Sequence, residues 1–220
     1  MRRWRRVAGL VGLLAATALV STGVTWQAAA ADKERHKLHP TAVVPNLPAG
    51  QSNPLIANGV SVGAYVASYK SSGTGPGALN TGAPAGTPER YIDVAQFPGG
   101  QLSEGVTITE AQALNALARI GENLASAGLG YDDVMSMRVF LDNPPGTTVA
   151  DYAGWNRAYR QYFANIDLAT GEVAPVPLGT AAPAPPWVPN KARPSRSTIE
   201  VGSLPVAGWL VEVEVEAVIR

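Results

Sequence analysis

The sequence predicts an α+β domain in which two helices cover one face of a mixed sheet. Three observations predict this fold. Strand-like stretches lie at both ends of the chain, two stretches have amphipathic helical spacing, and one more alternating stretch separates the helices. The resulting element order is β-β-α-β-α-β-β. Because there is only one helix layer, the other sheet face needs a cover, which chains of this size often obtain by oligomerising.

The first half of the domain contains two strands and a helix. Residues 55–62 and 65–69 are typical of strands. The run Thr107-Ile108-Thr109-Glu110 has the spacing of a capping box and predicts a helix that ends near Ala127, before two glycines. The expected apolar face of this helix comprises Leu114, Leu117, Ala118, Gly121, Leu124 and Ala125.

The second half contains a strand, a helix and two closing strands. Residues 134–141 alternate at period two and predict a strand. A helix is expected from Asp151 to about Ala164, and the closing strands are expected near residues 196–203 and 209–219. The apolar side of this second helix comprises Tyr152, Trp155, Tyr159 and Phe163, which we interpret as packing residues.

The first 31 residues have the layout of a secretory signal. Four arginines precede an apolar run over residues 7–24, and alanines at 28–31 supply the small residues of a cleavage site. We therefore expect export, with a secreted or periplasmic protein that has no membrane contact after the signal, residues 1–31, is cleaved. An uncleaved anchor is the alternative, since the apolar run is about long enough to span a bilayer.

The remainder divides into a leader and one domain. Residues 32–52 are polar and contain proline, and we expect a flexible leader. Residues 53–220 are of a size that suits a single domain. Inside it, two long stretches rich in Gly and Pro, at about 74–105 and 166–193, predict inserted loops that are either functional or mobile.

Composition excludes several classes of function. Residues 1–31 hold four of the 17 Lys and Arg and none of the 17 Asp and Glu, so the rest of the chain is acidic and unsuited to non-specific nucleic-acid binding. The absence of cysteine excludes disulfides, thiol catalysis and Cys-based zinc sites. The two histidines, His36 and His39, lie in the leader, which excludes a Ser-His-Asp triad in the domain. We expect no metal.

Arg196 is the strongest candidate for a binding residue. It lies in the run Arg193–Val201, and a stretch with three alternating glutamates, Glu212, Glu214 and Glu216, follows. A guanidinium can bind a carboxylate through two parallel hydrogen bonds. A carboxylate that faces the arginine across the sheet would position a water. These residues predict a site for a small carboxylate-bearing molecule.

The chain from about Leu55 to Arg220 resembles the RidA family, also described as YjgF-like or endoribonuclease L-PSP. The C-terminal run Pro-Ser-Arg-Ser-Thr-Ile-Glu-Val, the later Leu-Pro and the run Leu-Val-Glu-Val-Glu are similar to the family's P-A-R-S-x-V-x-V, L-P and V-E-I-E-A. The four matching segments are residues 194–214, residues 151–163, residues 127–134 and residues 72–74, the last similar to the family's S-G-Q.

The resemblance implies a chorismate-mutase-like fold and a homotrimer, in which the sheets form a central barrel and three sites lie in clefts between subunits. Proteins of the family hydrolyse reactive enamines and imines, such as 2-aminoacrylate, to 2-keto acids and ammonia without a cofactor. The family's carboxylate-binding arginine matches Arg196, and its water-orienting glutamate matches Glu212. That match needs one extra residue before the last strand, so Glu214 is the alternative. The remaining matches are the substrate-binding residues Asn156, Ser72, Gly73 and Thr198, the last at the family's cysteine position.

The sequence supports two hypotheses about function. An enamine and imine deaminase, a hydrolase, is the first, since such a substrate is already electrophilic and needs only a held carboxylate and a placed water. A non-catalytic module that binds a small ligand or a protein is the alternative. It is favoured by the two inserted loops, the expected export and the lack of a tyrosine before Tyr65 where the family has one. Ribonuclease activity is disfavoured by the acidic charge and the lack of histidine in the domain.

Overall fold

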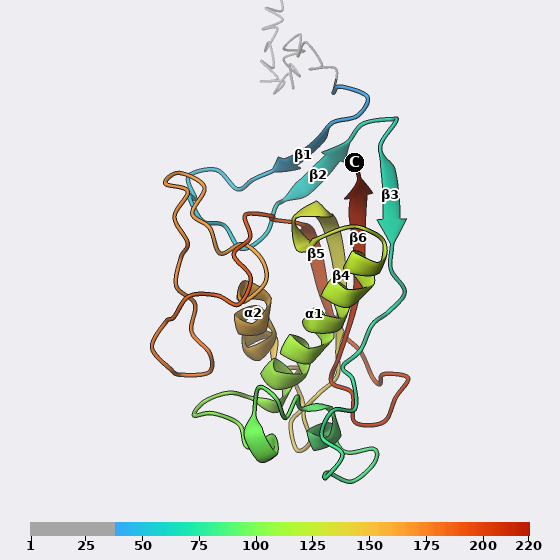
Figure 1. Ribbon diagram of the computed structural model, residues 1–220, viewed down its shortest axis with the longest axis vertical. Coiled ribbons are helices and arrows are strands. Elements are labelled where there is room, and N and C mark those ends of the chain that lie inside the picture. The colour runs from blue at the N-terminus through green and yellow to red at the C-terminus, as the bar shows by residue number, and fades with distance from the viewer. Residues whose placement is uncertain (1–37) are drawn as a thin grey trace, which may run out of the picture. The chain divides into compact units, whose positions relative to one another are not determined.

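The computed structural model describes residues 38–220 (Figure 1). The predicted signal and the first residues of the predicted leader lie outside these residues. The strands are β1 (Val43–Asn46), β2 (Gly59–Val62), β3 (Ala67–Lys70), β4 (Val134–Leu141), β5 (Ser195–Glu200) and β6 (Val211–Ile219). The helices are α1 (Ile108–Ser126) and α2 (Tyr152–Arg160), with short 3-10 turns η1 (Pro88–Tyr91), η2 (Pro98–Gly100) and η3 (Tyr131–Asp133).

The main sheet is mixed, as predicted, and has the strand order β3-β6-β4-β5. Strands β4 and β5 run parallel, whereas β6 is antiparallel to both of its neighbours. Along β6 the valines and Ala217 are buried, and the three glutamates between them are half-buried. Figure 1 shows α1 lying across β4 and β6 with α2 beside it, so both helices cover one face. The predicted α+β class is confirmed.

Helix α1 provides much of the core. The Thr107 hydroxyl accepts a hydrogen bond from the Glu110 amide, so the predicted cap forms, but the Glu110 carboxylate binds Arg157 and the Gly179 amide and does not complete a capping box. Full burial of each large aliphatic side chain stabilises the fold by about 1.5–3 kcal/mol. The predicted face is correct at its leucines, but Ala125 is exposed and Ala118 only half-buried. The fully buried aliphatic side chains of α1 are Leu114, Leu117, Ile120 and Leu124.

Helix α2 is shorter than predicted, because it ends at Arg160 rather than near Ala164. Ala164 has a φ of 55°, a left-handed conformation that cannot continue a helix. The Arg160 side chain donates to the Ala164 carbonyl and satisfies it after the helix ends. Phe163 is nevertheless buried and stacks on Tyr159. Neither helix within residues 38–220 is both long and apolar enough to cross a bilayer.

The N-terminal strands differ from the prediction. The predicted leader contains β1, which pairs antiparallel with β2, so residues 43–46 are structured. The strand expected over residues 55–62 is reduced to β2, and β2 pairs with β1 rather than with the main sheet. Residues 55–58 reach the main sheet only where the Ala57 amide donates to the Pro194 carbonyl beside β5.

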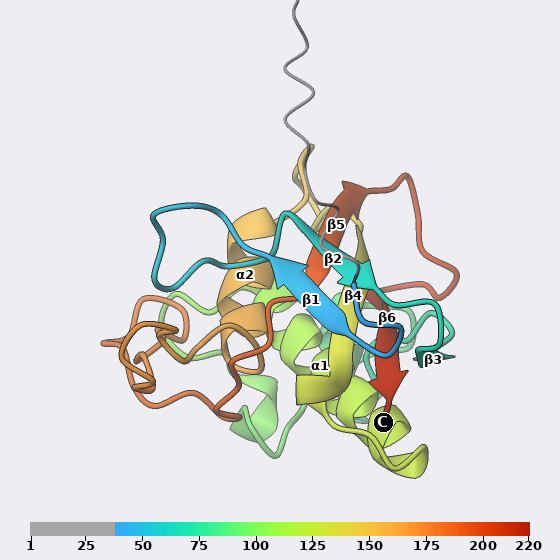
Figure 2. The same cartoon turned by 90° about the horizontal axis from the view of Figure 1, so that it is seen from above.

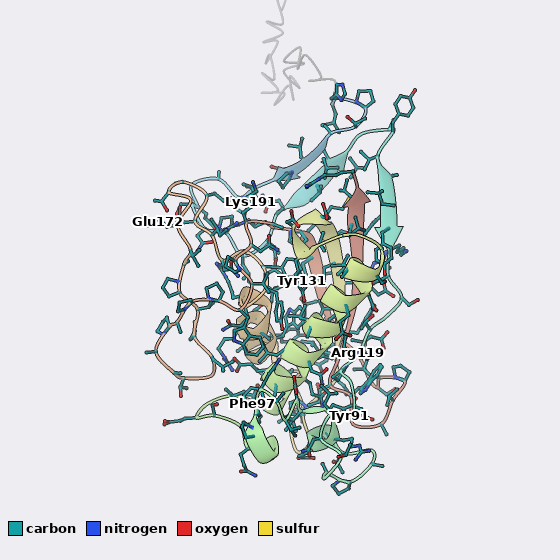
Figure 3. All side chains as sticks on the ribbon, in the orientation of Figure 1. Tyr91, Phe97, Arg119, Tyr131, Glu172 and Lys191 are labelled. Atoms are coloured by element: carbon teal, nitrogen blue, oxygen red, sulfur yellow. The ribbon has the colours of Figure 1, made fainter. Side chains whose placement is uncertain are left out.

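The first long loop, residues 74–105, packs against α1. Gln112 of α1 donates to the Pro88 carbonyl, and Asn115 donates to the carbonyls of Gly77 and Tyr91. These hydrogen bonds pair buried side-chain amides of α1 with backbone carbonyls of the loop. Figure 3 shows Tyr91 and Phe97 beside one end of α1. The loop therefore extends the core around that end of the helix.

Candidate functional site

Arg196 lies on β5, at one edge of the main sheet, and its side chain is directed at α2. It pairs with Met137, which is buried under the helices, so both side chains lie on the helix-covered face. The Arg196 Nη2 donates to Asn156 Oδ1 at 2.6 Å. Its Cζ lies 4.5 Å from the centre of the Tyr159 ring and 5.8 Å from that of Trp155. Cation–π contacts of this kind hold the guanidinium plane in place.

The guanidinium of Arg196 has two donors without an acceptor. Its Nε and Nη1 atoms are buried and have no hydrogen-bond partner among the described residues. No carboxylate in residues 38–220 forms an ion pair with it. Burial lowers the pKa of Arg196 below its usual value, and the nearby positive charge of Arg160 lowers it further. A desolvated cation with open donors is destabilising by itself, and an incoming anion would relieve that cost.

Two more buried polar atoms without a described partner lie on β5, which carries Arg196, and on α2, which contacts it. Thr198 follows Arg196 by two residues on the same face of β5, and its Oγ1 has no partner within the described residues. Trp155 precedes Asn156 on α2, and its Nε1 is also without a partner there. Sequence reasoning missed Trp155 and Tyr159 as site residues, because their helical spacing is equally typical of core packing. Their positions beside Asn156 were the available signal.

Glu212 belongs to a second group of residues, with Ser72 and Gly73. There is no room for a side chain at Gly73, since a Cβ built there would lie 2.7 Å from Glu212 Cδ and overlap Oε1. Thr74 pairs with Val213 through two backbone hydrogen bonds, which fixes Gly73 beside the start of β6. Ser72 is exposed at the same place.

The three glutamates of β6 have different partners. Glu214 forms an ion pair with Arg138 at 3.1 Å, and Glu216 accepts a hydrogen bond from the Ser68 hydroxyl at 3.1 Å. Glu212 forms no ion pair within the described residues. Partial burial raises the pKa of Glu212 above its usual value, and the neighbouring charge of Glu214 adds to the effect. Glu212 is thus the carboxylate that lies free beside Gly73, whereas Glu214 is engaged elsewhere.

The expectation that Arg196 and Glu212 face each other across the sheet is wrong for a single protomer. Strand β4 lies between β5 and β6, with Arg196 opposite Met137 and Glu212 opposite Phe140. Met137 and Phe140 are three residues apart on β4, so their side chains point to opposite faces. The chain brings Arg196, Asn156 and Thr198 together at one edge. It brings Ser72, Gly73 and Glu212 together near the other.

A concave surface adjoins the arginine edge of the sheet. A cleft of about 470 Å³ lies along β5 and β4 and is bounded by residues 56–58, Met137, Arg138 and residues 195–197. In the part of the chain that the structure describes, no three His, Asp or Glu side chains converge as metal ligands. The chemistry available at this edge is hydrogen bonding and ion pairing to an anion.

One family model matches more than half of the chain. The family model described as "Endoribonuclease L-PSP" matches residues 95–219. Similar solved structures include the Rid-family protein YyfB of Yersinia pestis, 19% identical over 80% of this chain and 97% of that chain, with a TM-score of 0.43. A YjgF/YER057c/UK114-family member of Mycobacterium tuberculosis is 20% identical over 81% and 100%, with a TM-score of 0.38. Escherichia coli TdcF, solved with bound serine, is 20% identical over 77% and 98%, with a TM-score of 0.39. No curated protein matches the chain.

Proposed function

This chain belongs to the endoribonuclease L-PSP family, which includes the RidA-like proteins, and on that premise we propose that it hydrolyses 2-imino acids and their enamine tautomers to 2-keto acids and ammonia. One observation carries the proposal. Two buried N–H donors of Arg196 have no acceptor within residues 38–220. Contacts with Asn156 and Tyr159 orient the guanidinium that carries them. Open donors on a buried guanidinium suit an anion such as the carboxylate that every 2-imino acid bears.

The remaining residues supply what hydrolysis needs. The carboxylate of the substrate binds Arg196, and Thr198 donates to the substrate from the same strand. Glu212 accepts a proton from a water as its oxygen adds to the imine carbon. Glu212 then returns this proton to the nitrogen, the carbon–nitrogen bond breaks as the hydroxyl gives up its proton, and ammonia leaves while the carbon becomes a ketone. A carboxylate with a raised pKa is a better proton acceptor for this step than an ordinary glutamate.

The site needs more than one protomer, because its two groups lie near opposite edges of the sheet. Arg196 is on the edge strand β5, and Gly73 follows the other edge strand, β3. A ring in which one protomer's β5 edge meets the next protomer's β3 edge would bring the two groups to the same interface, with Arg196 on the helix-covered face and Glu212 on the other. Head-to-tail contacts that close in this way give cyclic oligomers. We propose the homotrimer implied by the family as that ring, with a site in each cleft.

An imine-trapping assay tests the activity. An amino-acid oxidase generates the imine, and its loss is followed with and without the purified protein. We expect faster imine loss with the protein, and a fall of about 100-fold in kcat/KM for Arg196→Gln, since two charged hydrogen bonds are worth about 3 kcal/mol or more. Arg220→Gln is the matched control, because Arg220 is exposed and its ion pair with Asp133 is worth little.

Three outcomes separate the proposals. Acceleration that depends on Arg196 supports the hydrolase. Saturable binding of 2-keto acids that depends on Arg196 but occurs without turnover supports the non-catalytic binding module instead. Full activity in Arg196→Gln, or neither turnover nor binding, would contradict both. The predicted export is a separate proposal, which N-terminal sequencing of the protein recovered outside the cytoplasm would test.

A further inference from the structure

A second cleft lies directly beside the Arg196 group. It has a volume of about 470 Å³ and is bounded on one side by α2 and on the other by residues 174–177 of the second long loop. Figure 1 and Figure 2 both show the loop over residues 166–193 beside α2, and Figure 3 labels Glu172 and Lys191 on it. Asn156 lines this cleft and also binds Arg196, so the Asn156 side chain lies between the cleft and the carboxylate-binding group.

The loop wall of the cleft is fixed to the domain at several points. The buried carboxylate of Glu110 accepts from Arg157 at 2.7 and 2.9 Å and from the Gly179 amide at 3.0 Å. Gln161 donates to the Pro177 carbonyl at 3.3 Å, and the Ala174 amide donates to the Asn165 carbonyl. These bonds tie both ends of the wall to α1, α2 and the segment after α2. The cleft is therefore preformed and does not depend on a loop that closes over a ligand.

The charged side chains that line this cleft are two arginines. The carboxylate of Glu110 neutralises the charge of Arg157. It accepts only from Nε and Nη2, so the Nη1 amino group of Arg157 can donate to a ligand. Arg160 binds neutral acceptors, namely the Asn53 side chain and the carbonyls of Asn53 and Ala164. Burial lowers the pKa of Arg160 below its usual value. An anion in the cleft would therefore meet a guanidinium charge that no carboxylate of the described residues neutralises.

The spacing suits a ligand with two acidic ends. Asn156 and Arg160 are four residues apart on α2, so their side chains start about 5–6 Å from each other on one side of the helix. The two carboxylates of a five-carbon diacid are separated by a similar length. In the cleft, Asn156 lies at the end nearer to Arg196, and Arg160 lies at the opposite end. We propose that the substrates are 2-imino dicarboxylic acids, with the 2-carboxylate on Arg196 and the distal carboxylate in the cleft between α2 and the second long loop.

This inference rests on the proposed function and narrows its substrate class. It assigns a role to residues 166–193 that the sequence analysis left open. The loop forms the wall that confines the distal carboxylate beside Arg160. Ala174, on that wall and half-buried, is the position at which the charge of the cleft is most simply changed, because its only described hydrogen bond uses the backbone amide.

Titration calorimetry of the whole protein with two stable product analogues tests the inference. The probes are 2-oxoglutarate and 2-oxopentanoate, which have the same chain length and differ in the distal carboxylate. We expect 2-oxoglutarate to bind the unmodified protein at least about 10-fold more tightly, the equivalent of 1.4 kcal/mol. Ala174→Glu places a carboxylate opposite Arg160 and should abolish this preference without weakening 2-oxopentanoate. Ala174→Gln, of equal size and neutral, should retain it.

The outcomes distinguish this inference from the proposed function. Equal affinity of the two keto acids for the unmodified protein overturns the dicarboxylate cleft and leaves the hydrolase proposal standing. Loss of the preference in both Ala174 variants also overturns it, because the effect would then come from bulk and not from charge. Failure of both keto acids to bind, together with no acceleration of imine loss, contradicts the hydrolase proposal and this inference with it.

Discussion

Gly73→Ala separates catalysis from stability. The added methyl carbon would lie 2.7 Å from Glu212 Cδ and overlap Oε1, whereas ordinary side-chain contacts begin near 3.4 Å. The carboxylate is the free end of a flexible side chain, so it should move aside by roughly 1 Å and leave the backbone in place. A misplacement of about 1 Å at a reacting centre costs on the order of 100-fold in rate. Gly73 does not have a positive φ, so alanine fits the backbone and should change the free energy of unfolding by less than about 1 kcal/mol.

The assay measures kcat for imine hydrolysis beside a urea unfolding curve for the same preparation. We expect kcat to fall by about 100-fold while the unfolding midpoint stays almost unchanged. Gly202→Ala is the matched control, because a Cβ at Gly202 meets no atom within 4 Å. Retention of full activity in Gly73→Ala would refute the role of Glu212, since the carboxylate cannot keep its place once the methyl group is present. A large loss of stability would show that the strain lies in the backbone instead.

Three further predictions concern charged and polar side chains of the core and of the candidate site. Glu110→Gln leaves Arg157 without its counter-ion and should destabilise the protein by about 2–4 kcal/mol in urea unfolding, with a smaller loss when Arg157→Met is added. Glu214→Gln removes one charge that raises the Glu212 pKa, so the pH at which imine hydrolysis declines on acidification should fall; an unshifted pH–rate profile would argue against Glu212 as the proton acceptor. Trp155→Phe removes a buried donor that has no described partner and leaves a cavity, so the melting temperature should fall and KM should rise; an unchanged KM would exclude Trp155 from the site.

Local sequence patterns predicted the bounds of a helix or strand correctly where those bounds depend on residues of that element alone. The Thr107 cap sets the start of α1, and the alternation over residues 134–141 predicts the bounds of β4. The end of α2 could not be predicted, because it depends on the left-handed backbone at Ala164 and on the bond from Arg160. Pairing of β2 with β1 was also beyond local patterns, because it depends on contacts between distant segments.

The candidate site was only partly predictable for the same reason. The structure places Asn156 against Arg196 and Gly73 beside Glu212, although the sequence did not indicate which of these candidate residues would lie together. The separation of these two groups depends on strand order, because β6 pairs with β3 and β4 and leaves β5 at the edge. The contact of Tyr159 with the guanidinium was missed, since an aromatic residue at helical spacing is equally consistent with core packing.

The most direct test of a shared site is complementation between two inactive variants. Arg196→Gln and Glu212→Gln proteins are unfolded together, refolded as a mixture, and assayed for imine hydrolysis beside each variant refolded alone. In randomly mixed rings about a quarter of the interfaces combine an intact Arg196 from one protomer with an intact Glu212 from its neighbour. Recovery of about that fraction of normal activity is the expected result. A mixture no more active than its components, although mass spectrometry shows mixed oligomers, would mean that no site is built from these two side chains across an interface.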